Sequence, residues 1–240
     1  MSRVARVLDA LKRSKPDPLT SVALTMPVFL IYHLGILLID KRNGVDWVSQ
    51  LTLRLLDASV PAYAGVTIGL CVALALTLWI LRKRGTLEPK DLLPVVAESG
   101  LWAVVMLASV GYAVQSMAPA LSVGSTALVL NPLEKIVMAA GAGFHEEVVF
   151  RVLLFSGGAR LLIQLLKARV VGAFVLSALL SSLAFAFVHH LGLGGEGITL
   201  AAFSFRTLAG LYLCAVYAAR GFAIAVYTHA LYDALVFFVL

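Results

Sequence analysis

The segment Val170–His190, VVGAFVLSALLSSLAFAFVHH, decides the fold class of this chain. It contains no Lys, Arg, Asp or Glu over 21 residues. A helix needs about 20 mostly apolar residues to cross the hydrocarbon core of a bilayer. The segment therefore predicts a transmembrane helix.

The composition of the whole chain supports the same interpretation. Of its 240 residues, 61% are hydrophobic and 13% are charged, and the mean hydropathy is +0.96. Soluble domains contain roughly 45–50% apolar and about 25% charged residues. A soluble fold of this length cannot hide so much apolar surface, which excludes a cytosolic enzyme, a disulfide scaffold and a disordered chain. We expect an all-α, polytopic transmembrane helix bundle.

Six further apolar segments bring the expected number of spans to about seven, with six to eight possible. The first of them exceeds the core of a signal peptide and lacks a small-residue cleavage site, so we expect it to be retained. The fourth is unusual because it contains charged residues. The expected spans are Leu19–Ile39, Ala62–Leu81, Leu93–Ser116, Pro132–Phe155, Val170–His190, Ile198–Ala219 and Phe222–Leu240.

The distribution of basic residues predicts the orientation. The N-terminal segment contains five Lys or Arg, 82–90 contains four and 160–169 contains three, whereas 117–131 and 191–197 contain none. Cytoplasmic loops carry the excess of Lys and Arg, so we expect the N-terminus in the cytoplasm. The net charge of +6 is then an orientation signal rather than a sign of nucleic-acid binding.

The segment 40–61 is an exception, because it places three basic residues on the expected outer side. Its part Trp47–Leu56 is amphipathic and predicts an interfacial helix. A miscounted span is the alternative. The segment Arg160–Arg169 (RLLIQLLKAR) has a similar pattern and predicts a helix lying along the inner interface.

Ionisable residues inside the spans concentrate in the second half, where each costs several kcal/mol unless it is paired or hydrated. In Glu146-Glu147-Val-Val-Phe-Arg151, Glu147 and Arg151 are four residues apart and share one helix face. Glu146 points roughly 100° away from that face and is therefore available for chemistry. The alternative is that both acids only brace Arg151 and a neighbouring helix.

Two later spans contribute imidazoles. His229 and Asp233 share a face of the last span, and His189 lies at the end of the fifth. A single histidine in an apolar helix is commonly a structural hydrogen-bonding residue. Three helices that each bring Glu or His into the interior instead predict a shared polar cavity. The intramembrane set is Glu146, Glu147, Arg151, His189, His190, Arg206, His229 and Asp233, and the first half adds only His33 and Glu98.

Several known site patterns are absent from the sequence. His145-Glu146-Glu147-Val-Val is not HExxH. There is no GxSxG motif, which weakens a serine protease interpretation, and no P-loop or Rossmann glycine pattern. Ser181 and Ser182 are better explained as helix-packing residues. Cys71 and Cys214 have no CxxC spacing and predict neither a disulfide framework nor a metal site.

Three ordered motifs resemble those of the CPBP intramembrane glutamic endopeptidases, the CAAX prenyl protease and bacteriocin-processing family that includes the type II CAAX prenyl endopeptidases. They are Glu146-Glu147-x-x-x-Arg151, Phe185-x-x-x-His189 and His229-x-x-x-Asp233. The resemblance covers about residues 130–240. We therefore expect variable N-terminal membrane helices at 1–125 and a CPBP-like catalytic core at 126–240, within a single membrane domain.

The resemblance implies a metal-independent glutamate protease that uses no cofactor. By carry-over, Glu146 would activate a water molecule and His189 would help to hold that water. His229 and Asp233 would stabilise the oxyanion of the tetrahedral intermediate, as hydrogen-bond donors do in acyl transfer. Glu147 and Arg151 would form the supporting pair.

The chain departs from the family pattern at two positions. The family commonly has Gly directly after the motif Arg, where this chain has Val152, and Asn where this chain has Asp233. An ionised carboxylate accepts hydrogen bonds and repels an oxyanion. Asp233 is therefore either protonated or orients His229, and we favour the second interpretation.

Family branches cut prenylated CAAX tails, bacteriocin leader peptides and C-terminal sorting signals. The expected partners are therefore a membrane-associated protein or peptide, cleaved near its C-terminus or membrane segment, and the lipid bilayer, but not nucleic acid. The expected location is the inner membrane of a bacterial or archaeal cell. The sequence does not indicate the oligomeric state.

Three alternatives remain open at this point. Glu146, His189 and His229 are chemically adequate ligands for the zinc of a metalloprotease. Glu146, His189 and Asp233 could form the relay of a proton-coupled transporter, although the chain has no inverted repeat. In a non-catalytic membrane scaffold or immunity protein, the motifs would only hold helices together.

Overall fold

The computed structural model describes residues 17–56, 59–82, 92–117, 130–191 and 198–239, and these residues form helices and connecting loops without a strand. The all-α prediction is confirmed. The basic segments 1–16 and 83–91 lie outside the described residues. The helices are α2 (Pro18–Gly35), α3 (Trp47–Leu55), α4 (Val60–Arg82), α5 (Leu92–Met117), α6 (Pro132–Gly141), η2 (Ala142–Gly157), α7 (Gly158–Leu166), α8 (Val170–Val188), α9 (Leu200–Arg220) and α10 (Phe222–Val239).

Within this described part, six helical stretches are long and apolar enough to cross a membrane. They are α2, α5, the continuous helix formed by α6, η2 and α7, and then α8, α9 and α10. Helix α4 lies where the remaining expected span lies, and the part of it that qualifies as apolar is shorter, Val60–Ala73. The predicted multi-pass helix bundle with six to eight spans is therefore confirmed.

The helix Pro132–Leu166 is the longest of these stretches, with 35 residues. It begins with a capping box, in which the Asn131 side chain accepts from the Glu134 amide and the Glu134 carboxylate accepts from the Asn131 amide. At about 1.5 Å per residue, it is longer than the roughly 30 Å hydrocarbon core, so at least one end extends beyond it.

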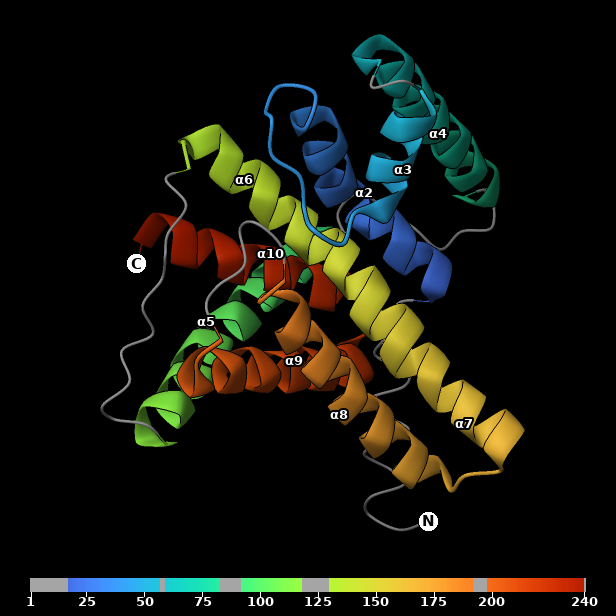
Figure 1. Cartoon of the computed structure of the whole chain (residues 1–240). Coiled ribbons are helices and arrows are strands. Elements are labelled where there is room, and N and C mark those ends of the chain that lie inside the picture. Colours follow the sequence, from blue (N-terminus) through green and yellow to red (C-terminus); the bar gives the residue numbers. More distant parts are fainter. Residues whose placement is uncertain (1–16, 57–58, 83–91, 118–129, 192–197, 240) are drawn as a thin grey trace.

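The segment predicted to lie along the inner interface does not form a separate helix. Helix α7 continues the spanning helix in the same direction instead of turning away from it (Figure 1). No proline or capping residue interrupts the backbone at Gly157 and Gly158, and both glycines keep right-handed helical dihedral angles. The helix ends only at Lys167, which adopts a left-handed conformation with φ of 53°.

Helix α8 shows how the bundle is adapted to lipid. Its serines face inward and its large aliphatic side chains face outward: Ser181 and Ser182 are buried, whereas Leu180 is 56% exposed. The Ser181 hydroxyl donates to the Phe150 carbonyl of η2. Ser182 packs so closely on α9 that a Cβ at Gly210 would lie 2.9 Å from the Ser182 Cβ. Small residues at helix contacts are typical of membrane proteins.

Helix α2 packs against the second half of the chain through close glycine contacts. Tyr32 belongs to the same core cluster as Val137 of α6 and Val226 of α10. A Cβ at Gly141 would lie 2.4 Å from the Tyr32 ring, and a Cβ at Gly35 would lie 2.3 Å from the Val137 side chain. Helix α2 therefore fits directly against the helix that carries the two adjacent glutamates.

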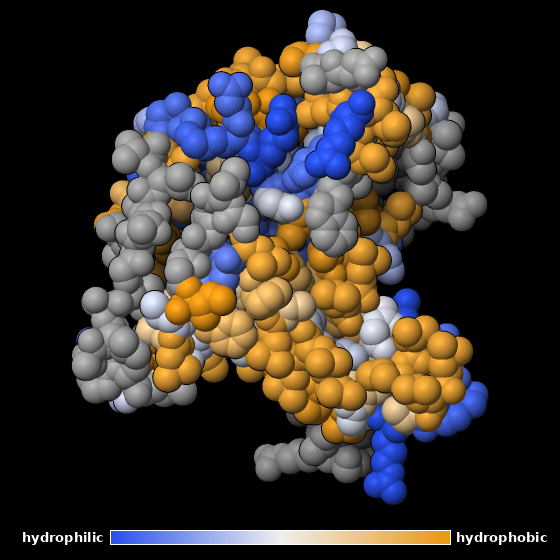
Figure 2. Space-filling model, in the orientation of Figure 1, coloured by the Kyte–Doolittle hydropathy of each residue, from blue (hydrophilic) through white to orange (hydrophobic). Residues whose placement is uncertain are grey.

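The loop between α2 and α3 enters the bundle beside α6 (Figure 1). In Figure 2, hydrophilic residues gather at this end of the molecule, whereas hydrophobic residues cover most of the surface toward α7 and α8. Lys41 ties the loop to the start of α6 through an ion pair with Glu134 at 2.6 Å. Helix α3 begins directly after the loop, at the amphipathic segment that the sequence predicts as a helix, with Asp46 as its N-cap.

Candidate active site

Glu147 is the centre of a buried charge network. It is fully buried, and its Oε2 lies 3.3 Å from the Nε of Arg151, the partner expected one turn later. The two residues lie in η2, a stretch of π-helix, and such stretches occur frequently at functional sites. The Arg151 guanidinium also lies 4.6 Å from the centroid of the Phe185 ring, a cation–π contact that helps to hold the buried charge.

The second oxygen of Glu147 orients His229. The Nδ1 of His229 lies 2.8 Å from Glu147 Oε1, and because a carboxylate accepts, Nδ1 is the donor. The other ring nitrogen therefore points toward Glu146, whose Oε2 lies 3.8 Å away. Asp233 lies on this Nε2 side, with its Oδ2 at 3.7 Å from Nε2. His229 thus donates its Nδ1 hydrogen to Glu147, and the orienting role expected for Asp233 stays a prediction.

His189 faces the same oxygen from α8. It caps the C-terminus of this helix, and its Nδ1 donates to the Phe185 carbonyl at 2.8 Å. Its Nε2 lies 3.6 Å from Glu146 Oε2. The Phe185 ring packs against both imidazoles, with centroids 4.6 Å from His189 and 5.8 Å from His229. The phenylalanine of the motif therefore holds both rings in place.

The two imidazoles and Glu146 form an arrangement that suits a water molecule. Both distances from Oε2 are too long for direct hydrogen bonds, which lie near 2.7–3.2 Å. Since the Nδ1 of His189 carries a hydrogen, the Nε2 of this ring in its neutral form is an acceptor. A water molecule beside Oε2 can donate one hydrogen to the carboxylate and the other to an imidazole. The side chains of His189 and Asp233 keep 20% and 17% of their surface exposed, so the site is not sealed.

A close contact between η2 and α10 sets the distance between Glu147 and His229. A Cβ at Gly143 would lie 2.6 Å from the Ala230 Cβ and 2.7 Å from the Val226 carbonyl oxygen. Gly143 precedes Glu147 by four residues and contacts α10 beside His229. Only glycine allows the two helices to approach so closely at this position.

Three further ionisable residues of the spans have identifiable contacts. Arg206 of α9 interacts electrostatically with Glu146, His189 and Asp233, so it adds positive charge to the site. The His190 ring stacks on Phe203. Glu98 pairs with Arg220, with Oε2 at 2.8 Å from Nη2.

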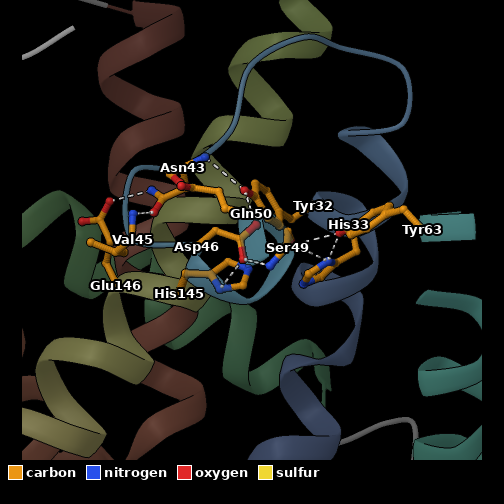
Figure 3. A network of polar contacts seen from close by, with 10 residues as sticks. All are labelled: Tyr32, His33, Asn43, Val45, Asp46, Ser49, Gln50, Tyr63, His145 and Glu146. Atoms are coloured by element: carbon orange, nitrogen blue, oxygen red, sulfur yellow. Dashed lines mark hydrogen bonds and ion pairs between the residues drawn. The ribbon is translucent and has the colours of Figure 1, made fainter. Parts of the chain in front are cut away.

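The α2–α3 loop also contributes to the site, and the sequence did not predict this contribution. Asn43 donates from Nδ2 to Glu146 Oε1 at 2.7 Å, and Figure 3 shows this contact at one side of a larger polar network. The network includes Asp46, which lies 3.6 Å from His145, and Tyr63, whose hydroxyl lies 2.9 Å from His33 Nδ1. Asp46 followed by Ser49 is an N-cap pattern that predicts the start of α3, but nothing in the sequence links the loop to Glu146.

Among the described residues, no group of three or more His, Cys, Asp and Glu is arranged to hold a metal ion. The expectation of a site without a metal therefore remains a prediction that chelation can test. The zinc alternative gains no support from the arrangement of these side chains.

The fold and the site together define a multi-pass membrane protein in which buried acids and imidazoles from different helices converge. Residues 128–235, which contain all three motifs, match the family described as type II CAAX prenyl endopeptidase, Rce1-like. Residues 128–235 are therefore a domain of this family, which is a family of membrane proteases. No curated protein and no solved structure gives a significant match.

Proposed function

We propose that this protein is an intramembrane endopeptidase in which Glu146 activates the attacking water. The observation that carries the proposal is the placement of Glu146 Oε2 opposite two imidazole Nε2 atoms, at 3.6 and 3.8 Å. Glu146 takes a proton from the water, and the hydroxide attacks the carbonyl carbon of the scissile peptide bond. His189 holds the water during this step. Glu146 then returns the proton to the leaving amine as the tetrahedral intermediate collapses.

His229 is the proposed donor to the oxyanion. Its Nδ1 is bonded to Glu147, which favours the protonated ring, and the protonated ring carries a hydrogen on Nε2. One donor of this kind contributes roughly 3 kcal/mol to transition-state stabilisation. Asp233, at 3.7 Å from Nε2, stabilises the charged imidazole electrostatically in this mechanism.

We propose the same substrate classes that the family resemblance implies. These are membrane-associated proteins or peptides, cut near a prenylated tail, a leader peptide, a C-terminal sorting signal or another membrane segment. A site built on membrane-spanning helices suits substrates that lipid already holds beside it.

We further propose that residues 126–240 form the catalytic core and that residues 1–125 form the variable part. We also propose that the N-terminus lies in the cytoplasm of a bacterial or archaeal cell.

The test compares peptides released from membranes that contain the wild-type chain or Glu146→Gln. We expect a set of peptides whose release requires Glu146 and survives treatment with a chelator. Glu98→Gln is the matched control, because it removes a carboxylate that pairs with Arg220 away from the site. Identical peptide sets from the wild type and Glu146→Gln would refute the proposal, and loss of release upon chelation would favour the zinc alternative. The most strongly released peptide, synthesised with a fluorophore and a quencher, then becomes the reporter peptide.

A further inference from the structure

Asn43 reaches the site from a part of the chain that precedes the family-matched residues 128–235. Three hydrogen bonds fix the position of Asn43 itself. The backbone amide of Asn43 donates to the Tyr32 hydroxyl at 3.0 Å, and its carbonyl accepts from Gln50 at 3.4 Å. Its side-chain Oδ1 accepts from the Val45 amide at 3.0 Å. This last bond fixes the orientation of the carboxamide, because only the oxygen can accept from a backbone amide.

The fixed orientation directs the NH₂ group of Asn43 at Glu146. The Nδ2 lies 2.7 Å from Oε1, and both residues are buried, with 5% and 6% of their surface exposed. Hydrogen bonds to a charged acceptor are about twice as strong as neutral ones. The bond therefore decides which oxygen of Glu146 is occupied and which one faces the two imidazoles.

The loop that carries Asn43 is anchored on three helices. The Tyr32 hydroxyl of α2 donates to Asp46 Oδ2 at 2.8 Å, and Asp46 Oδ1 accepts from the Ser49 amide of α3 at 3.0 Å. Lys41 pairs with Glu134 of α6 at 2.6 Å. Figure 3 shows the loop crossing beside Glu146 with the Asn43 side chain between this carboxylate and the rest of the network.

We propose that Asn43 is a positioning residue of the proteolytic site, which holds Glu146 Oε1 so that Oε2 stays presented to the water and to the two imidazoles. The proposal rests on the proposed function and adds to it a part from outside the family domain. The two imidazoles lie 3.6 and 3.8 Å from Oε2, and Asn43 donates to the other oxygen, Oε1, so its loss frees the carboxylate to rotate.

Two substitutions separate this role from a merely structural one. Asn43→Asp keeps an oxygen that accepts from Val45, and so keeps the loop contact, but it places a carboxylate against Glu146. Asn43→Ala loses both contacts without adding a repulsive charge. A positioning role predicts that Asn43→Asp is the slower enzyme, although it retains more of the loop. A structural role predicts the opposite order.

The measurement is cleavage of the reporter peptide by the full chain in lipid bilayers, with kcat and KM determined separately. We expect kcat to fall by about tenfold to a hundredfold for Asn43→Ala and further for Asn43→Asp, with KM within about twofold of the wild type, since Asn43 contacts the base rather than the substrate. Lys41→Ala is the matched control, because it loosens the same loop without touching Glu146, and it should keep kcat within about twofold.

The outcomes are distinguishable from those of the proposed function. If Glu146→Gln is inactive but Asn43→Asp cleaves as fast as Asn43→Ala or faster, the positioning role is refuted and the proposed function stands. A change in KM alone would refute the role as well, as would equal losses for Lys41→Ala and both Asn43 variants. If Glu146→Gln retains activity, the proposed function fails and the positioning role fails with it.

Discussion

Two buried clusters of acids and imidazoles lie side by side in this bundle, and they differ in how their polar atoms are used. In the first, His189 and His229 direct their Nε2 atoms at Glu146 without bonding to it directly. In the second, around Asp46, side chains bond to one another and to the backbone of the loop (Figure 3). In the first cluster the two Nε2 atoms and Glu146 Oε2 are placed to bind another molecule. In the second cluster the hydrogen bonds hold the α2–α3 loop in position.

The difference explains why one cluster suits chemistry and the other suits structure. In the first cluster the side chain of His189 is 20% exposed, whereas in the second Asp46 is fully buried. Asn43 joins the two clusters through its bond to Glu146. Substitutions in the first cluster should therefore affect catalysis, and substitutions in the second should mainly affect stability.

Glu147→Gln should have the largest effect, because Glu147 serves the site and the stability of the bundle together. It leaves the Arg151 charge buried without its counterion, which costs about 3–5 kcal/mol of unfolding free energy. Cleavage of the reporter peptide should also be lost, because His229 loses its charged partner. Titration of the protein in mixed micelles with sodium dodecyl sulfate measures the stability. Adding Arg151→Met should restore stability but not cleavage, and recovery of cleavage in that double variant would contradict the role of Glu147.

Gly143→Ala should have the next largest effect, and it should fall mainly on activity. The added Cβ forces η2 and α10 apart beside His229, and a displacement of about 1 Å at a catalytic group costs roughly a hundredfold in rate. The reporter peptide measures this loss. Gly172→Ala on α8 is the control, because nothing lies within 4 Å of its added Cβ. An active Gly143→Ala enzyme would show that the close helix contact is not required.

Asp46→Asn should affect stability more than activity, in contrast to Gly143→Ala. It weakens the contacts to Tyr32 and His145 in the second cluster, so unfolding free energy should fall by about 1–3 kcal/mol. Cleavage should fall less than tenfold, because the Asn43 side chain keeps its bond to Val45. The comparison of the two clusters would fail if Asp46→Asn were as inactive as Glu146→Gln while remaining folded.

Tyr63→Phe should have the smallest effect. The hydroxyl of Tyr63 contacts His33 and Ser49 at the end of the network that is farthest from Glu146 (Figure 3). We expect a loss of about 1 kcal/mol in unfolding free energy and cleavage within twofold of the wild type. Parallel titration and cleavage assays check both values, and a large loss of activity would indicate that the second cluster takes part in catalysis.

The sequence predicts the parts of this architecture that depend on local patterns. Apolar runs locate the spans because the thickness of the hydrocarbon core fixes their length. The spacing of Glu147 and Arg151 predicts their pairing because residues four apart are neighbours on a helix. The motifs on three spans predict a shared cavity, and the structure brings Glu146, His189 and His229 together around one carboxylate oxygen.

The parts that local patterns cannot predict depend on contacts between distant segments. Asn43 and Glu146 are 103 residues apart, and no periodicity relates a loop to a helix face. The bond from His229 Nδ1 to Glu147 spans 82 residues, whereas Asp233, the partner predicted from sequence, is a neighbour within the same helix. The course of α7 depends on uninterrupted backbone hydrogen bonding at Gly157 and Gly158, whereas its amphipathic composition favours an interfacial helix.

The most direct test of the central claim is an experimental structure of the Glu146→Gln variant in lipid with the reporter peptide bound. We expect the scissile carbonyl carbon within reach of the substituted side chain through one water molecule, and the carbonyl oxygen about 3 Å from the Nε2 of His229. A peptide bound with its scissile bond away from these groups would contradict the account.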